Sequence, residues 1–173
     1  MNVKFLNPFV EAAHEVLQRE TGINITRGEL GLEKNAYLTD DVTVIISLVG
    51  RVEGTVFYAM SQDTGIARAS RILGEPLEAL NALAQSGIAE LGNVITGRAS
   101  VKLSEAGYES TISPPTMLLG KGATISTLDF ARLVVPLNSE CGAVVIHLAL
   151  REGANRGLTA AALSVPARPA VVG

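Results

Sequence analysis

Three polar residues share one stripe of the longest predicted helix, which we expect to run from Leu77 to about Glu105. Ser86, Glu90 and Asn93 follow one another at spacings of four and three residues, so they lie on one helix face. Carboxylate and amide side chains are hydrogen-bonding groups that could serve a site on this face. An exposed helix face should also be polar in any case, and Ser, Glu and Asn are ordinary residues on a solvated helix face.

Glycines beside the stripe favour a functional site over a plain solvated surface. Gly87, Gly92 and Gly97 lie inside the predicted helix, where each costs about 1 kcal/mol relative to alanine. Such a cost needs a compensating reason, and close approach of another chain segment is the usual one. Asparagine is a mediocre helix former, so Asn93 gains nothing from a bare solvent face. Two of these glycines, Gly92 and Gly97, leave Asn93 uncovered.

Several kinds of chemistry lack the residues they need. No glycine-rich phosphate loop of the GxxxxGK[ST] kind occurs, which argues against nucleotide binding. The single cysteine, Cys141, excludes a disulfide framework and a cysteine-based zinc site. The two histidines, His14 and His147, have neither metal-ligand spacing nor the setting of a Ser-His-Asp triad. We therefore expect no metal or cofactor bound by this chain.

Length and composition point to a compact globular protein. The chain has 173 residues, of which 47% are hydrophobic and 18% charged, and this excludes an intrinsically disordered protein. The net charge of -3 argues against a nucleic-acid partner. The longest apolar runs, Val42–Val49 and Ala143–Leu150, are far shorter than a membrane span. We expect a soluble, cytoplasmic protein.

Helices and hairpins alternate along the chain, which predicts an α+β fold. Asn7 and Pro8 are placed to begin a first helix, and Gly22 to end it. A short helix should follow Ser61 and end at Gly74. Two β-hairpins are predicted, with arms at Val42–Val49 and Val52–Met60, and at Phe130–Leu137 and Gly142–Leu150.

The two halves of the chain are alike in their order of elements. Val52–Val56 is echoed by Glu140–Val144, and the half-repeats span about 7–60 and 77–150. We predict an internal pseudo-two-fold repeat, although hairpins resemble one another in general. Residues 1–150 then form a single domain, and the Ala-, Gly- and Pro-rich residues 151–173 are a C-terminal extension.

A helical wheel divides the long helix into an apolar arc, an arc of small residues and the polar stripe. We expect the apolar arc to face the sheet and the small residues to admit the first helix. The apolar arc holds Leu80, Leu83, Ile88, Leu91, Val94 and Ile95, and the small arc holds Ala82, Ala89, Gly92 and Thr96.

The polar stripe and a later proline pair carry a family resemblance. Ser86-x3-Glu90-x2-Asn93, followed by Pro114-Pro115, resembles the signature of the CheC/CheX/FliY chemotaxis phosphatases. The spacing from Asn93 to Pro115 differs by one residue from that of the family. The opening run from Asn7 to Ala12 looks like the start of CheX-type members, and the order of elements is similar throughout residues 1–150.

The first helix carries an incomplete copy of this motif. Asn7, Glu11, His14 and Gln18 have the same spacing, but His14 stands where the motif has Asn. We assign this copy no catalysis. One intact motif is typical of CheX-type members, whereas CheC-type members carry two.

The resemblance implies a CheC-like fold with two long antiparallel helices on a mostly antiparallel sheet. It further implies a phosphatase that hydrolyses the phospho-aspartate of a CheY-type response regulator, with Asn93 orienting the attacking water and Glu90 anchoring the partner. Ser86 and Pro115 would support the site, the regulator would supply Mg²⁺, and the protein would be a homodimer. A non-catalytic adaptor for a response regulator or flagellar switch component is the alternative, and a structural or oligomerisation domain is a third possibility.

Overall fold

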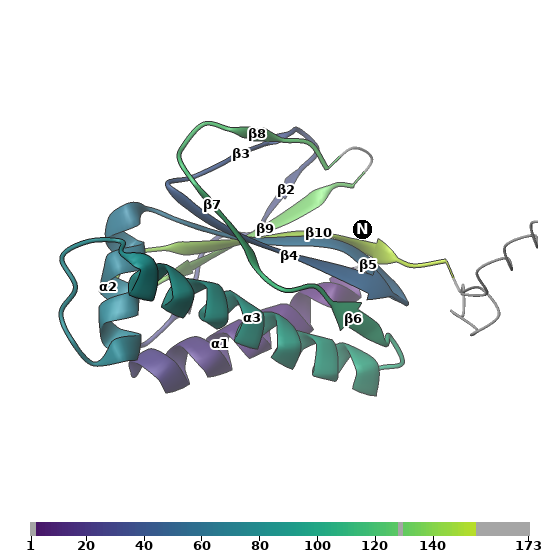
Figure 1. The fold of residues 1–173 in the computed structure, drawn as a ribbon. Helices are drawn as coiled ribbons and strands as arrows, with labels where there is room; N and C mark the ends of the chain where they lie inside the picture. Colours follow the sequence, from purple (N-terminus) through teal and green to yellow (C-terminus); the bar gives the residue numbers. More distant parts are fainter. Residues whose placement is uncertain (1–2, 128–129, 155–173) are drawn as a thin grey trace, which may run out of the picture.

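Two helices lie side by side beneath a central β-sheet, and a small flap covers part of the other face of the sheet (Figure 1). The computed structural model describes residues 3–127 and 130–154. The lower layer holds α1 (Leu6–Thr21) and α3 (Ala82–Glu105), and α2 (Gln62–Leu73) stands at one end of it. The predicted α+β class is confirmed.

The number of helices corrects the fold that the resemblance implied. That fold counted two long helices, whereas the described residues contain three α-helices. The third, α2, is the short helix that the sequence predicted after Ser61, whose side chain accepts a hydrogen bond from the Thr64 backbone N–H at 3.2 Å. It ends at Gly74, which has the left-handed φ of +71° that glycine adopts without strain.

The central sheet is antiparallel at every pairing between described strands. Both predicted hairpins are confirmed, and they lie next to each other at the centre of the sheet. The strand order is β1-β9-β10-β5-β4-β6, with β2 also on β9 and β7 also on β4. The strands are β1 (Thr26–Arg27), β2 (Gly31–Glu33), β4 (Val42–Gly50), β5 (Val52–Met60), β6 (Ser110–Ile112), β7 (Thr116–Leu119), β9 (Arg132–Asn138) and β10 (Val144–Glu152).

Alternating side chains bury both faces of this sheet. The face toward the helices carries the main core, in which Val44, Ile46, Val56 and Ile146 are almost fully buried. The opposite face is covered by a flap, the two-stranded sheet of β3 (Tyr37–Leu38) and β8 (Thr124–Ile125).

Two helix starts differ from the predictions. Phe5 rather than Asn7 is the residue before α1, because a short 3-10 helix, η1 (Val3–Phe5), leads directly into it. The long helix α3 begins at Ala82 rather than Leu77, because the Asn81 side chain accepts from the Ala84 backbone N–H at 2.9 Å and caps it there. The predicted stop of α1 at Gly22 is confirmed, with φ of +64°.

The pseudo-two-fold repeat and the single domain stay predictions. The hairpins β4–β5 and β9–β10 are adjacent, but α2 follows only the first of them. The last strand, β10, continues to Glu152, into the segment assigned to the C-terminal extension, and residues 155–173 lie outside the described residues. Among described helices, none is long and apolar enough to cross a membrane.

Candidate functional site

The helix that carries the polar stripe is held tightly against the sheet. A Cβ atom added at Gly92 would come within 3.1 Å of Val44 and 3.3 Å of the Tyr58 ring. The Tyr58 hydroxyl lies 2.7 Å from Thr96 Oγ1, which itself donates to the Gly92 carbonyl at 2.8 Å. Both side chains are buried, and burial raises the pKa of Tyr58, so the phenol stays protonated.

This packing corrects the predicted roles of the helix arcs. The arc of small residues faces the sheet at Gly92 and Thr96. The small side chains therefore allow α3 to approach the sheet closely, and not the first helix as predicted. Leu83, assigned to the arc facing the sheet, is 51% exposed. Ile88, Leu91 and Ile95 of that arc are buried as predicted.

The stripe itself lies on the outer surface of α3. Ser86 and Glu90 are exposed, and Asn93 is half-buried. Within the described part of the chain, the side chains of Glu90 and Asn93 form no hydrogen bond or ion pair. Their polar groups are therefore available to water or to a partner.

The proline pair interrupts a strand at the edge of the sheet beside α3. Strands β6 and β7 both pair with β4, and Pro114 and Pro115 lie between them. Proline has no backbone N–H, and Ser113 bridges the gap in the ladder. Its side-chain oxygen accepts from the Ser47 backbone N–H at 2.9 Å, and its own N–H donates to the Ser47 carbonyl at 2.9 Å.

A shallow depression of about 550 Å³ lies over α3 and joins Asn93 to this edge. Gly97 and Ile112 line it together with Asn93, and a Cβ at Gly97 would lie 4.0 Å from the Ile112 side chain. Pro115, Glu90 and Ser86 are not among its lining residues. The structure thus brings Asn93 beside the end of β6, while Glu90 and Ser86 stand on open surface.

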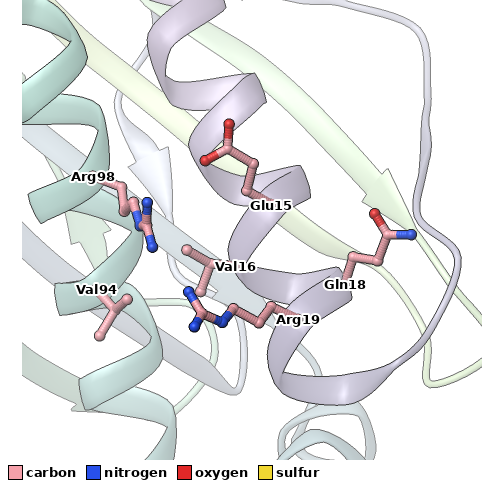
Figure 2. A pocket seen from close by; sticks show the side chains of 6 residues that line it. All are labelled: Glu15, Val16, Gln18, Arg19, Val94 and Arg98. Carbon is pink, nitrogen blue, oxygen red and sulfur yellow. The ribbon is translucent and has the colours of Figure 1, made fainter.

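A second depression of about 520 Å³ lies on the surface between α1 and α3, and residues of both helices line it. Figure 2 shows that the guanidinium groups of Arg19 and Arg98 both reach into it, and Val16 and Val94 line it as well. Local sequence patterns do not connect these arginines, because they lie 79 positions apart. The available signal was Arg98, an exposed cation five residues after Asn93 on the same helix.

Ion pairs on the same two helices engage one residue of the incomplete motif copy on α1. Lys102 of α3 lies 3.0 Å from Glu15 and 3.3 Å from Glu11, and these two carboxylates raise the pKa of Lys102. Glu11, which stands where the motif has its glutamate, is thus paired within the chain. His14 is exposed. Among the described residues, no group of three or more His, Cys, Asp or Glu side chains could hold a metal ion.

Helices α1 and α3 pack under an antiparallel sheet, and Glu90 and Asn93 lie on the outer surface of α3. The chain belongs to the chemotaxis phosphatase CheX family, whose family model matches residues 42–138. It is 26% identical over 155 residues to the CheY-P phosphatase CheX of Thermotoga maritima, covering 88% of this chain and 99% of that protein.

Solved structures give the same assignment. A CheC-like superfamily protein from Shewanella sp. PV-4 is 28% identical with a TM-score of 0.79, covering 87% of this chain and 99% of that one. The Borrelia burgdorferi chain solved in a CheX-CheY-BeF3-Mg²⁺ complex is also 28% identical. Its TM-score is 0.73, and the match covers 87% of this chain and 100% of that one.

Proposed function

We propose that this chain hydrolyses the phospho-aspartate of a CheY-type response regulator, with Asn93 orienting the attacking water and Glu90 anchoring the regulator. The observation that carries the proposal is the placement of Glu90 and Asn93, one turn apart on the outer surface of α3 and without a side-chain partner among the described residues. Membership of the CheX family and likeness to the Thermotoga maritima CheY-P phosphatase support the reaction.

Hydrolysis of an acyl phosphate needs neither a protein nucleophile nor a strong base. The bond is already activated, and its transition state is loose, so placing a water molecule in line and stabilising charge are sufficient. The Asn93 amide suits this task because its oxygen accepts a hydrogen bond from water while its NH₂ group can donate to a phosphoryl oxygen. No proton acceptor with a shifted pKa is needed.

Rigidity of α3 supports the positioning role of Asn93. The helix is fixed from below by Gly92 against Val44 and by the buried Tyr58–Thr96 hydrogen bond. A side chain on such an element keeps its direction better than one on a loop. Because Gly97 carries no side chain, the space beside Asn93 stays open to a partner.

The remaining residues and partners complete the proposal. Glu90 would pair with a lysine beside the phosphorylation site of the regulator, since charge-assisted hydrogen bonds are strong and directional. Ser86 and Pro115 would support the site, Pro115 by shaping the edge next to β4. Mg²⁺ would be held by the regulator, and we expect a cytoplasmic homodimer without a cofactor of its own.

Phosphate release from a Mg²⁺-loaded CheY-type regulator of the same cell, charged with a small acyl phosphate, tests this proposal. We expect the parental chain to accelerate release, Asn93→Ala to lose about 100-fold or more of that acceleration, and Glu90→Ala to weaken regulator binding as well as turnover. Glu109→Ala removes an exposed carboxylate just beyond α3 and serves as the matched control, with parental activity expected.

Two results would contradict the proposal. If Asn93→Ala and Glu90→Ala both release phosphate at the parental rate, the stripe is not the catalytic site. If the parental chain binds the phosphorylated regulator without accelerating phosphate release, the protein is an adaptor rather than a phosphatase.

A further inference from the structure

The groove between α1 and α3 carries two arginines that form no ion pair with an acidic side chain among the described residues. Arg19 and Arg98 are exposed, and neither forms an ion pair or hydrogen bond with another described residue. Figure 2 shows both guanidinium groups converging on the depression from opposite helices. Like charges brought together in this way repel each other unless an anion lies between them.

The carboxylate that lines this depression, Glu15, is paired with a cation of α3 that it shares with Glu11. Its Oε1 lies 3.0 Å from Lys102 Nζ, further along α3. Figure 2 shows the Glu15 carboxylate turned away from Arg19 and toward α3, the helix that carries Lys102. The open end of the groove therefore presents positive charge, on a chain whose net charge is -3.

We propose that this groove docks acidic side chains at the rim of the phosphorylation site of the response regulator, with Arg19 and Arg98 as the specificity-determining residues. The inference rests on the proposed function, because it takes the regulator as the partner. A regulator that holds Mg²⁺ beside its phosphorylated residue would carry one or two carboxylates there, because Mg²⁺ is usually bound by carboxylates together with phosphate oxygens. The phosphoryl group adds further negative charge there.

The groove lies within reach of the same partner. Arg98 follows Asn93 by five residues, which is about 7.5 Å along the helix axis and about 140° around it, so Arg98 lies on the side of α3 that faces α1. A stable interface covers about 800 Å² on each partner, so a regulator seated on Asn93 and Glu90 extends over Arg98 and onto α1. The depression over α3 that Asn93 lines also includes Arg98, so the two surfaces are continuous.

Charges at the rim of an interface act mainly on the rate of encounter. They steer an oppositely charged partner into place and lose their effect as salt screens them. Arg19 and Arg98 should therefore raise kcat/KM for the phosphorylated regulator and leave kcat at saturation unchanged.

The test compares the full-length double variant Arg19→Glu, Arg98→Glu with the parental chain. We expect kcat/KM to fall about tenfold or more at low ionic strength and the deficit to shrink as salt is added, with kcat within a factor of two. The matched control is Arg27→Glu, Lys121→Glu, which changes the net charge equally at exposed positions on β1 and on the segment after β7. The control should keep the parental kcat/KM.

Direct binding separates this inference from the proposed function. The affinity of the chain for a regulator loaded with Mg²⁺ and beryllium fluoride is measured with each variant, so that no turnover is required. If the groove variant binds the regulator more weakly and with less salt dependence, and the control variant does not, the result supports docking of the regulator on Arg19 and Arg98. This holds even where the parental chain releases no phosphate. An unchanged kcat/KM and affinity, or an equal loss in the control, would overturn the inference and leave the roles of Asn93 and Glu90 standing.

Discussion

At the scale of single residues, a buried hydrogen-bond chain sets the position of α3. Thr96 Oγ1 donates to the Gly92 carbonyl one turn earlier, so its lone pairs are left to accept from the Tyr58 hydroxyl. Neither Tyr58 nor Thr96 reaches water, and each satisfies the other. If one partner of such a pair is removed, the other stays buried without a hydrogen bond. The free-energy cost of that unsatisfied group is larger than the net stabilisation that the hydrogen bond provided.

Thr96→Val should therefore destabilise the protein by about 1–3 kcal/mol, because it keeps the shape of the side chain and removes the acceptor for Tyr58. Adding Tyr58→Phe should recover part of that loss, since the double variant leaves no orphaned hydroxyl. Urea unfolding of the parental chain and the three variants measures both effects. A double variant as unstable as the sum of the single ones would show that the two hydroxyls do not interact.

At the scale of elements, the glycines of α3 differ from one another in what they contact. Gly92 lies against Val44 and Tyr58, and a Cβ there would crowd both. At Gly87 a Cβ would have no neighbour within 4 Å. The close approach that the sequence predicted for this helix is thus real at Gly92 and absent at Gly87.

Alanine substitutions should separate the two positions. Gly87→Ala should raise the free energy of unfolding by up to about 1 kcal/mol through helix propensity alone. Gly92→Ala should lower it by about 1 kcal/mol despite the same gain, because the Tyr58 ring is tied to Thr96 and cannot withdraw from the new methyl group. Thermal and urea unfolding of both variants test this, and equal stabilisation by both would disprove the close packing.

At the scale of the whole molecule, the face of the sheet opposite the site carries a second buried cluster with a titratable group. His147 of β10 is 7% exposed, lies 4.6 Å from the Tyr37 ring of the flap, and has a buried Nδ1 without a hydrogen-bond partner among the described residues. Burial, followed by the positive charge of Arg132, lowers the pKa of His147 to about 4, and Glu33 partly opposes the shift. The folded protein therefore keeps this imidazole neutral.

Stability should consequently fall as the pH drops from about 6.5 to about 4, because the unfolded chain binds a proton at His147 and the folded chain does not. Above pH 6.5 this linkage does not lower the stability, and by about pH 4 it has lowered the free energy of unfolding by up to about 3 kcal/mol. His147→Phe removes the titrating group but keeps a ring against Tyr37. The stability difference between the parental chain and this variant should change across that pH range, and a constant difference would contradict the prediction.

Local pattern determined most of the elements and the nature of the stripe. The stop at Gly22, both hairpins and the short helix after Ser61 follow from residues close together in the sequence. The exposure of Ser86 and Glu90 follows from helical periodicity in the same way. Side-chain direction repeats with a fixed period in helices and strands, so a single segment carries this information.

Only the tertiary structure determines which element packs against each face of a helix. Periodicity places Gly92 and Thr96 on one arc but does not say whether a helix or a sheet covers it, and here Tyr58 of β5 does. Arg19 and Arg98 meet across the groove only because α1 and α3 pack side by side, 79 positions apart in the sequence. Contacts between residues far apart in the sequence depend on the packing of the whole chain, and the spacing of residues within one segment does not predict them.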